Sequence, residues 1–217
     1  MALAAQGAHV AVHYRNSAGE AADVVAAIEG GGGTAAAFRA DLLEPGACEG
    51  LVESVVARFG SLHVLVNNVG DFRSVDILDE DVAGLRAVVD ANLFTAFGLA
   101  QAALPVLRRQ DYGRVVMLGF AGGGRATVRH TGYAIAKQGL LVLVRSLALA
   151  LGSEPVTVNM VSPGTVEGAD ARPPLASVPR GRWARRDEVA AAVLYLLSAQ
   201  ADYVTGQNLE VAGGWGM

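Results

Sequence analysis

Residues 9–39 have the sequence HVAVHYRNSAGEAADVVAAIEGGGGTAAAFR, and this stretch decides the fold. A short apolar run, His9–Arg15, is followed by an Ala-rich segment of helical length, Ala18–Glu29. A second short run, Thr34–Arg39, comes after the glycines at positions 30–33, which are typical of the end of a helix. The stretch therefore predicts a strand, a helix and a second strand, which is the repeating unit of a parallel sheet.

The same alternation continues along the chain. Further strands are predicted at residues 62–66, 114–118, 156–161 and 207–211, and further helices at residues 46–59, 79–109, 132–151 and 186–198. Several of these strands are nearly continuous Val and Leu runs, which is typical of parallel strands covered by helices on both faces. We therefore expect an α/β fold with a doubly wound parallel sheet, in a single domain over residues 1–217, and a mixed α+β domain is the less favoured alternative.

The composition is that of a globular domain with a large core. Of the 217 residues, 52% are hydrophobic and 18% are charged, which argues against disorder. A net charge of −4 argues against a nucleic-acid-binding surface. Cys48 is the one cysteine, so an internal disulfide or a thiolate metal cage is excluded, and the four histidines have no metal-binding spacing. With no apolar run of membrane-spanning length and no signal-peptide pattern at the start, we expect a cytoplasmic protein without membrane partners.

Polar or glycine residues follow five of the predicted strands. They are Arg15-Asn16-Ser17, Asp41-Leu42, Asn67-Asn68-Val69-Gly70, Gly119-Phe120-Ala121-Gly122 and Ser162-Pro163-Gly164-Thr165. Each group alone fits an ordinary turn, because these residue types are common in turns. In a doubly wound sheet, however, ligands bind beyond the carboxyl ends of the strands, so five such groups at one edge predict a ligand cleft.

Tyr133 and Lys137 are four residues apart in an apolar predicted helix, GYAIAKQGLLVLVRSLALAL. This spacing places both side chains on one helix face. A lysine in such a helix must reach a polar cavity, since burying its charge without a partner is costly. We expect the neighbouring cation to lower the pKa of the Tyr133 phenol and make it a general acid near neutral pH. That chemistry suits the protonation of a carbonyl oxygen.

Together these motifs resemble the short-chain dehydrogenase/reductase family over essentially the whole chain. The matching segments are Asn67-Asn68-Val69-Gly70, Asn92, Tyr133-Ala-Ile-Ala-Lys137, Ser162-Pro163-Gly164 and the closing stretch from Tyr203 to Trp215. The resemblance implies a Rossmann-like fold and an NAD(P)-dependent oxidoreductase with a small-molecule substrate. It also implies a homodimer or homotetramer, because the family pairs its long apolar helices between subunits.

The resemblance also implies roles for individual residues. Tyr133 would be the catalytic acid/base, Lys137 would tune its pKa and hold the nicotinamide ribose, and Asn92 would keep a water that relays protons to Lys137. The implied cofactor-binding residues are Arg15, Asn16, Ser17, Asp41, Leu42, Asn68, Val69, Gly70, Tyr133, Lys137, Pro163, Gly164 and Thr165. No metal is implied.

The end of the first predicted strand bears on the choice of cofactor. NAD-preferring enzymes usually have an acidic residue there, but this chain has Arg15, followed by Asn16 and Ser17 at an expected helix start. A guanidinium, a hydroxyl and helix N-terminal amides suit a 2′-phosphate, and the motif is similar to NADPH-dependent ketoacyl-carrier-protein and pteridine reductases. We expect NADPH (NADP+), and the alternative is that Arg15 is a solvated residue at a strand end.

The chain departs from the family pattern at its start. The family begins with a strand and a glycine-rich turn that binds the pyrophosphate, and residues 1–10 contain no such segment. The missing strand would lie between the strands at residues 9–15 and 62–66. We therefore expect an N-terminally shortened domain that lacks the first strand, with unpaired edges on either side of an apolar slot.

A second departure affects the catalytic serine of the family. Counting back thirteen residues from Tyr133 reaches Phe120, and a phenyl ring cannot donate a hydrogen bond to an oxyanion. Thr127, His130 and Thr131 are alternative candidates for this donor. Phe120 would make the substrate pocket apolar and could stack on a flat substrate ring, or it could be a core residue in a degenerate site.

Two functions remain open from the sequence. The first is an NADPH-dependent reductase of a carbonyl group, or of a pteridine-type C=N group, with Tyr133 as the general acid. The second is a catalytically impaired or silent homologue that binds a nucleotide weakly or acts as a subunit, as Phe120 and the missing glycine loop suggest.

Overall fold

The computed structural model describes residues 1–169 and 174–216 and has the layered α/β architecture that the sequence predicts. Six strands are present in the described residues: β1 (His9–Tyr14), β2 (Thr34–Arg39), β3 (Val64–Asn67), β4 (Gly113–Leu118), β5 (Val156–Pro163) and β6 (Asn208–Val211). Every strand pair is parallel. The predicted strand at residues 62–66 begins two residues later, at Val64, where pairing with Arg114 of β4 begins.

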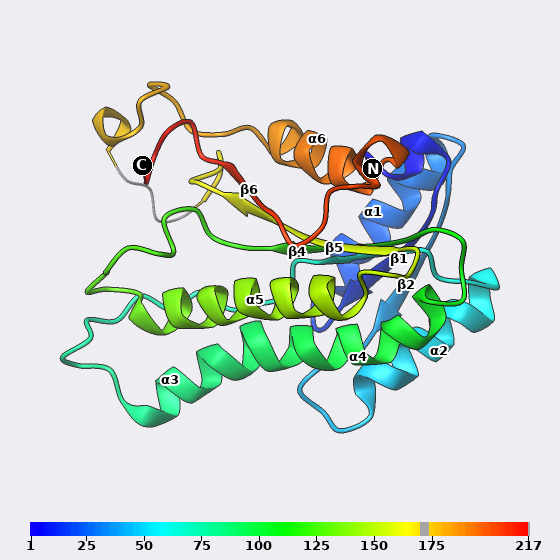
Figure 1. Cartoon of the computed structure of the whole chain (residues 1–217), viewed down its shortest axis with the longest axis horizontal. Coiled ribbons are helices and arrows are strands. Elements are labelled where there is room, and N and C mark those ends of the chain that lie inside the picture. Colours follow the sequence, from blue (N-terminus) through cyan, green and yellow to red (C-terminus); the bar gives the residue numbers. More distant parts are fainter. Residues whose placement is uncertain (170–173, 217) are drawn as a thin grey trace.

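Helices cover both faces of the sheet (Figure 1). They are α1 (Ala18–Gly30), α2 (Ala47–Phe59), α3 (Val82–Val89), α4 (Thr95–Leu107), α5 (Thr131–Ala150) and α6 (Arg186–Leu197). Residues of α2, α4 and α5 form one apolar core with β4 and β5, and its largest fully buried members are Leu107, Met117, Leu140 and Met160. Leu196 and Leu197 of α6 form a second core on the other face with Val116 and Val161. Both cores therefore use the same two central strands.

The helical region predicted at residues 79–109 begins at Val82 and contains a π-helical segment, Asp90–Phe94, between α3 and α4. Asp81 caps the N-terminus of α3, because its carboxylate accepts a hydrogen bond from the Gly84 amide at 2.6 Å. A π-helical turn inserts an extra residue and rotates the side chains that follow it, and such turns are frequent at functional sites. Here the turn contains Asn92.

The sheet is divided into two parts, β1–β2 and β3–β4–β5–β6. Among the described residues no strand pairs with the second edge of β1 or of β3. A cavity of about 480 Å³ separates these edges and is lined by Val10 of β1, Leu65 of β3 and apolar residues of α2. The predicted apolar slot between the two strands is therefore confirmed. Asn67 also lines this cavity, and its buried side-chain amide nitrogen has no hydrogen-bond partner.

Two helical stretches, Val82–Leu107 and Thr131–Ala150, are long and apolar enough to cross a membrane by length and composition alone. In the fold they are helices of one face of the sheet, and residues such as Ala96, Leu99, Leu140 and Val144 are buried in its core. Their apolar character is thus explained at least in part by packing within the molecule.

Candidate active site

Tyr133 and Lys137 lie one turn apart near the start of α5, beside the end of β4. The Lys137 side chain is 6% exposed, and its Nζ donates a hydrogen bond to the Leu118 carbonyl at 2.9 Å. The same Nζ lies 5.5 Å from the centroid of the Tyr133 ring. The helical spacing thus brings the phenol and the ammonium group to the same place at the sheet edge, as the sequence predicts.

Burial dominates the proton affinities of this pair. Desolvation lowers the pKa of Lys137 from 10.5 to about 8. The pKa of the Tyr133 phenol is raised by burial, which is opposite to the expectation that Lys137 would lower it. The physical reason is that burial removes hydration from Tyr133, which disfavours the charged phenolate.

Asn92 is held rigidly by the π-helical turn. Its Nδ2 donates to the carbonyl oxygens of Val88 at 2.9 Å and Asp71 at 2.8 Å. Its Oδ1 is buried and has no hydrogen-bond partner. Gly70 packs directly on this amide, and a Cβ at position 70 would overlap Asn92 Oδ1. The site therefore contains an unused buried acceptor, which is the kind of atom that an ordered water or a ligand satisfies.

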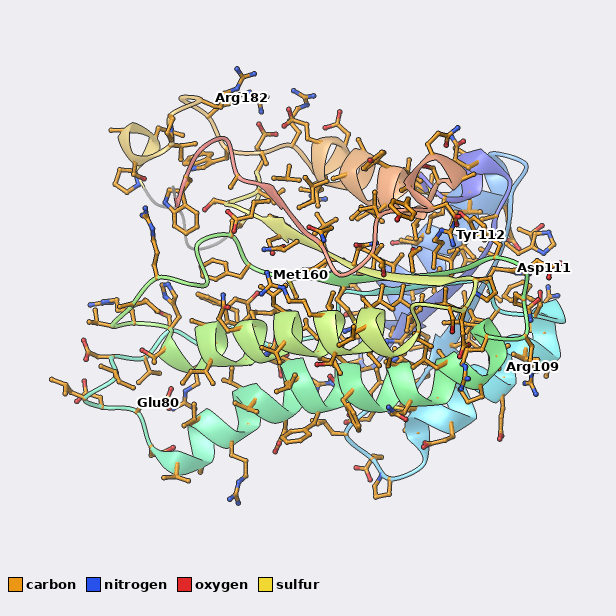
Figure 2. All side chains as sticks on the ribbon, viewed as in Figure 1. Glu80, Arg109, Asp111, Tyr112, Met160 and Arg182 are labelled. Atoms are coloured by element: carbon orange, nitrogen blue, oxygen red, sulfur yellow. The ribbon has the colours of Figure 1, made fainter. Side chains whose placement is uncertain are left out.

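A cavity of about 300 Å³ brings most of the predicted catalytic residues together. It is lined by Asn68, Gly70, Phe72, Asn92, Leu118, Gly119, Phe120, Tyr133, Lys137, Pro163 and Gly164. Among the expected cofactor residues on this side, Thr165 does not line the cavity and instead accepts a backbone hydrogen bond from Ala184. The cavity lies at the carboxyl ends of the strands, away from the loop of Arg109, Asp111 and Tyr112 that leads into β4 (Figure 2).

A second cavity, of about 440 Å³, contains the residues expected at the adenosine end of a dinucleotide. Among its lining residues are Arg15, Asn16, Ser17, Asp41, Leu42, Asn68, Val69 and Gly70. Asn68 and Gly70 line both cavities, so the two are neighbours along the sheet edge. The Arg15 guanidinium is 3.9 Å from the Asp71 carboxylate, and both side chains are largely in solvent. Such an exposed pair is weak, so Arg15 can turn to another anion at little cost.

Phe120 lies in the site and contacts its other rings. Its ring centroid is 5.5 Å from Tyr133, 5.8 Å from Trp215 and 5.9 Å from His130. Phe72 lies on the loop after β3 and contacts Tyr133 at 5.1 Å and His130 at 5.7 Å. Phe72 is a site residue that no sequence motif indicates, although its position two residues after Gly70, in a loop that leaves the sheet edge, is a usable signal.

The three candidate donors near Phe120 differ in how they are engaged. Thr131 donates its hydroxyl to the Thr127 carbonyl at 2.6 Å, and the Thr127 hydroxyl accepts a hydrogen bond from the Arg129 amide at 3.4 Å. The half-buried His130 ring makes no hydrogen bond among the described residues, and it contacts both Phe72 and Phe120. Among the described residues, Thr131 is therefore the candidate whose proton is already engaged, whereas the Thr127 hydroxyl and the His130 ring remain candidate donors.

The sequence model of the family described as "Enoyl-(Acyl carrier protein) reductase" matches residues 1–216. The chain belongs to the short-chain dehydrogenase/reductase family and is an NAD(P)-dependent oxidoreductase by family. The resemblance found from the motifs is thereby confirmed.

Curated relatives and solved structures agree with this assignment. The chain is 33% identical to a 3-oxoacyl-[acyl-carrier-protein] reductase of Synechocystis over 99% of this chain and 89% of the relative. It is also 33% identical to the same enzyme of Staphylococcus aureus, over 98% of this chain and 89% of the relative. A dehydrogenase/reductase from Sinorhizobium meliloti superposes with a TM-score of 0.92 at 30% identity, over 99% of this chain and 88% of the other. A mutant short-chain dehydrogenase/reductase from Serratia marcescens gives the same TM-score at 31% identity, over 99% and 90% of the two chains.

Proposed function

We propose that this protein is an NADPH-dependent reductase that reduces a carbonyl group, or a pteridine-type C=N group, with Tyr133 as the general acid. The observation that supports this most strongly is the cavity at the start of α5. It gathers a phenol, a buried ammonium group and a buried carboxamide oxygen without a partner, in a protein of an oxidoreductase family.

The site suits a nicotinamide dinucleotide at both ends. At the α5 end, the free Asn92 Oδ1 is a hydrogen-bond acceptor for an ordered water, and the absence of a Cβ at Gly70 allows the Asn92 amide to lie there. At the other end, Arg15 and Ser17 flank the start of α1, where backbone amides and a guanidinium favour a phosphate. Bound NADPH would supply the hydride that reaches the substrate carbon.

The chain itself supplies the proton and the positioning. The Tyr133 hydroxyl gives its proton to the substrate oxygen, and the resulting phenolate is stabilised by the Lys137 ammonium group. Lys137 is charged below pH about 8, and we propose that it also holds the nicotinamide ribose hydroxyls. A water held by Asn92 would return a proton through Lys137. Burial raises the pKa of the free phenol, so Tyr133 carries its proton at neutral pH but is a weaker acid than an exposed tyrosine, and stabilisation of the phenolate by Lys137 has to offset this.

The cofactor assignment is tested by titrating the protein with NADPH and NADH and following cofactor fluorescence. We expect tighter binding of NADPH, and we expect Arg15→Ala to weaken NADPH binding about tenfold or more while leaving NADH nearly unchanged. Arg58→Ala is the matched control, since Arg58 lies on α2 and does not line either cavity. Equal binding of both cofactors by the wild type would overturn the preference.

The catalytic assignment is tested with Tyr133→Phe, which removes the acidic hydroxyl and keeps the ring contacts. We expect it to bind NADPH like the wild type and to lose turnover by about 100-fold or more. Turnover that survives this substitution would refute the role of Tyr133.

A catalytically impaired homologue is the second candidate, and Phe120 at the expected serine position favours it. The substitution Phe120→Ser distinguishes an active reductase from a catalytically impaired homologue. A reductase adapted to Phe120 should lose activity or specificity on this substitution, whereas a degenerate site should gain activity.

We further propose a cytoplasmic homodimer or homotetramer with residues 1–217 as one domain. The outer surfaces of the helices in residues 82–150 support association, because Phe94, Phe97, Val142 and Leu149 are all exposed there. Static light scattering is the test, and a monomer over the whole accessible concentration range would contradict the proposal.

A further inference from the structure

Aromatic rings surround the proposed acid on two sides. Phe72 meets the Tyr133 ring at 5.1 Å with an interplanar angle of 79°, and Phe120 meets it at 5.5 Å with an angle of 66°. His130 lies within 6 Å of both phenylalanine rings, at 5.7 and 5.9 Å. These side chains come from the loop after β3, the loop after β4 and the start of α5, so three separate segments converge on one place.

The two phenylalanines line the 300 Å³ cavity together with Tyr133, and both of their rings contact the Tyr133 ring. The Trp215 ring contacts the Phe120 ring, with 5.8 Å between their centroids, and a Cβ at Gly122 would lie 3.3 Å from the Trp215 ring. Phe120 is therefore held in position by packing. Phe72 is 52% exposed, which leaves much of its surface available to a ligand.

A substrate that enters this cavity meets ring surfaces before it reaches the proton donor. Aromatic rings prefer edge-to-face or offset contacts with other aromatic rings, and such contacts add to the gain from simple apolar burial. A saturated group of the same size would be buried equally well but would lack the ring contacts. The arrangement therefore discriminates by aromaticity rather than by size alone.

We propose that the substrate is an aryl carbonyl compound, in which an aromatic ring next to the reducible C=O packs between Phe72 and Phe120 while the carbonyl oxygen reaches Tyr133. This inference rests on the proposed reductase function and narrows its substrate class. The hydride would go to the carbonyl carbon from NADPH and the proton to the oxygen from Tyr133, and the product is the aryl alcohol with NADP+.

The first test compares two ketones of matched shape, acetophenone and methyl cyclohexyl ketone, by the rate of NADPH oxidation. We expect kcat/KM to favour the aryl ketone by about tenfold, since two ring contacts of ordinary strength give a factor of that size. Phe120→Leu keeps the pocket apolar but removes one of the two rings, so it should reduce this preference to about threefold. Tyr203→Leu is the control, because it also removes a ring, but Tyr203 is fully exposed and lines neither cavity, so the preference should be unchanged.

A binding measurement separates the failure of this inference from the failure of the proposed function. Benzyl alcohol and cyclohexylmethanol are not reduced, so calorimetric titration reports binding alone, both for the free protein and with NADPH present. Tighter binding of benzyl alcohol that is weakened in Phe120→Leu supports the aryl site even if no ketone is turned over. Equal binding of the two alcohols by the wild type, or an undiminished preference in Phe120→Leu, overturns the inference even if other carbonyl compounds are reduced.

Discussion

The most quantitative prediction concerns Lys137, because its charged side chain is almost completely buried from solvent. The side chain is 6% exposed, and its pKa falls from 10.5 to about 8 because of that burial. Each pKa unit corresponds to about 1.4 kcal/mol, so a fall of about 2.5 units corresponds to about 3 kcal/mol. This is the free energy by which the folded protein disfavours the charged lysine relative to the unfolded chain.

The pH dependence of stability follows from this difference. Below pH about 8 the lysine is protonated in both the folded and the unfolded chain, so the cost of the buried charge is constant. Between pH about 8 and 10.5 the folded protein has released the proton and the unfolded chain still binds it. Because the unfolded state then binds more protons, the contribution of Lys137 to the free energy of unfolding rises with pH across this window.

Lys137→Met removes the titrating group and keeps a long apolar side chain. Comparing urea unfolding of the two proteins at pH 7 and pH 10, we expect the wild type to gain about 2–3 kcal/mol relative to the variant. At pH 7 the variant should be equally stable or up to about 2 kcal/mol more stable, since the loss of the hydrogen bond to Leu118 offsets part of the gain. Its reductase activity should be lost.

The pKa of Lys137 can also be measured directly. Lys137 is the one lysine in the sequence, so isotope-labelled lysine gives a single side-chain NMR signal that reports its pKa. A measured pKa near 10.5, or a stability difference that does not change between pH 7 and 10, would refute the account of a buried charge.

Two other changes test the construction of the site and of the sheet. Gly70→Ala should lower kcat about 100-fold, because the added Cβ displaces the Asn92 amide. Gly50→Ala on α2 is the control and should leave kcat unchanged, because a Cβ at that position meets no other atom. Normal kcat in both variants would show that the position of Asn92 is unimportant for turnover. Backbone amides of β1 should exchange hydrogen about 100-fold or more faster than those of β4, because one edge of β1 is unpaired and faces the apolar slot. Equal protection of the two strands would mean that this slot does not weaken the β1–β2 pair.

Much of the fold could be predicted because its signals are local. The alternation of short apolar runs with Ala-rich helical segments places all six strands, and the errors are confined to element ends such as the start of β3. The slot beside β1 could also be predicted, since it follows from strand order and the family pattern. Each of these features depends on sequence neighbours or on a regular topology.

The interior of the site depends on contacts between segments that are distant in the sequence, and fewer of its features could be predicted from the sequence. The π-helical turn that sets the direction of Asn92 has no pattern in residues 90–94 that distinguishes it from an ordinary helix. Phe72 reaches Tyr133 because of the path of an irregular loop, which periodicity does not describe. The sign of the Tyr133 pKa shift was predicted wrongly because charge proximity can be guessed from spacing, whereas the degree of burial cannot.

The most direct test of the central claim is the transfer of deuterium to a carbonyl substrate from NADPH in which both hydrogens at the nicotinamide C4 are deuterium. Acetophenone and a 3-oxoacyl thioester would be offered separately to the wild type and to Tyr133→Phe, and the alcohol products analysed by mass spectrometry. We predict that the wild type forms an alcohol with deuterium on the former carbonyl carbon and that Tyr133→Phe forms almost none. Absence of label in every wild-type product, or equal labelling by the two proteins, would contradict the proposed reductase mechanism.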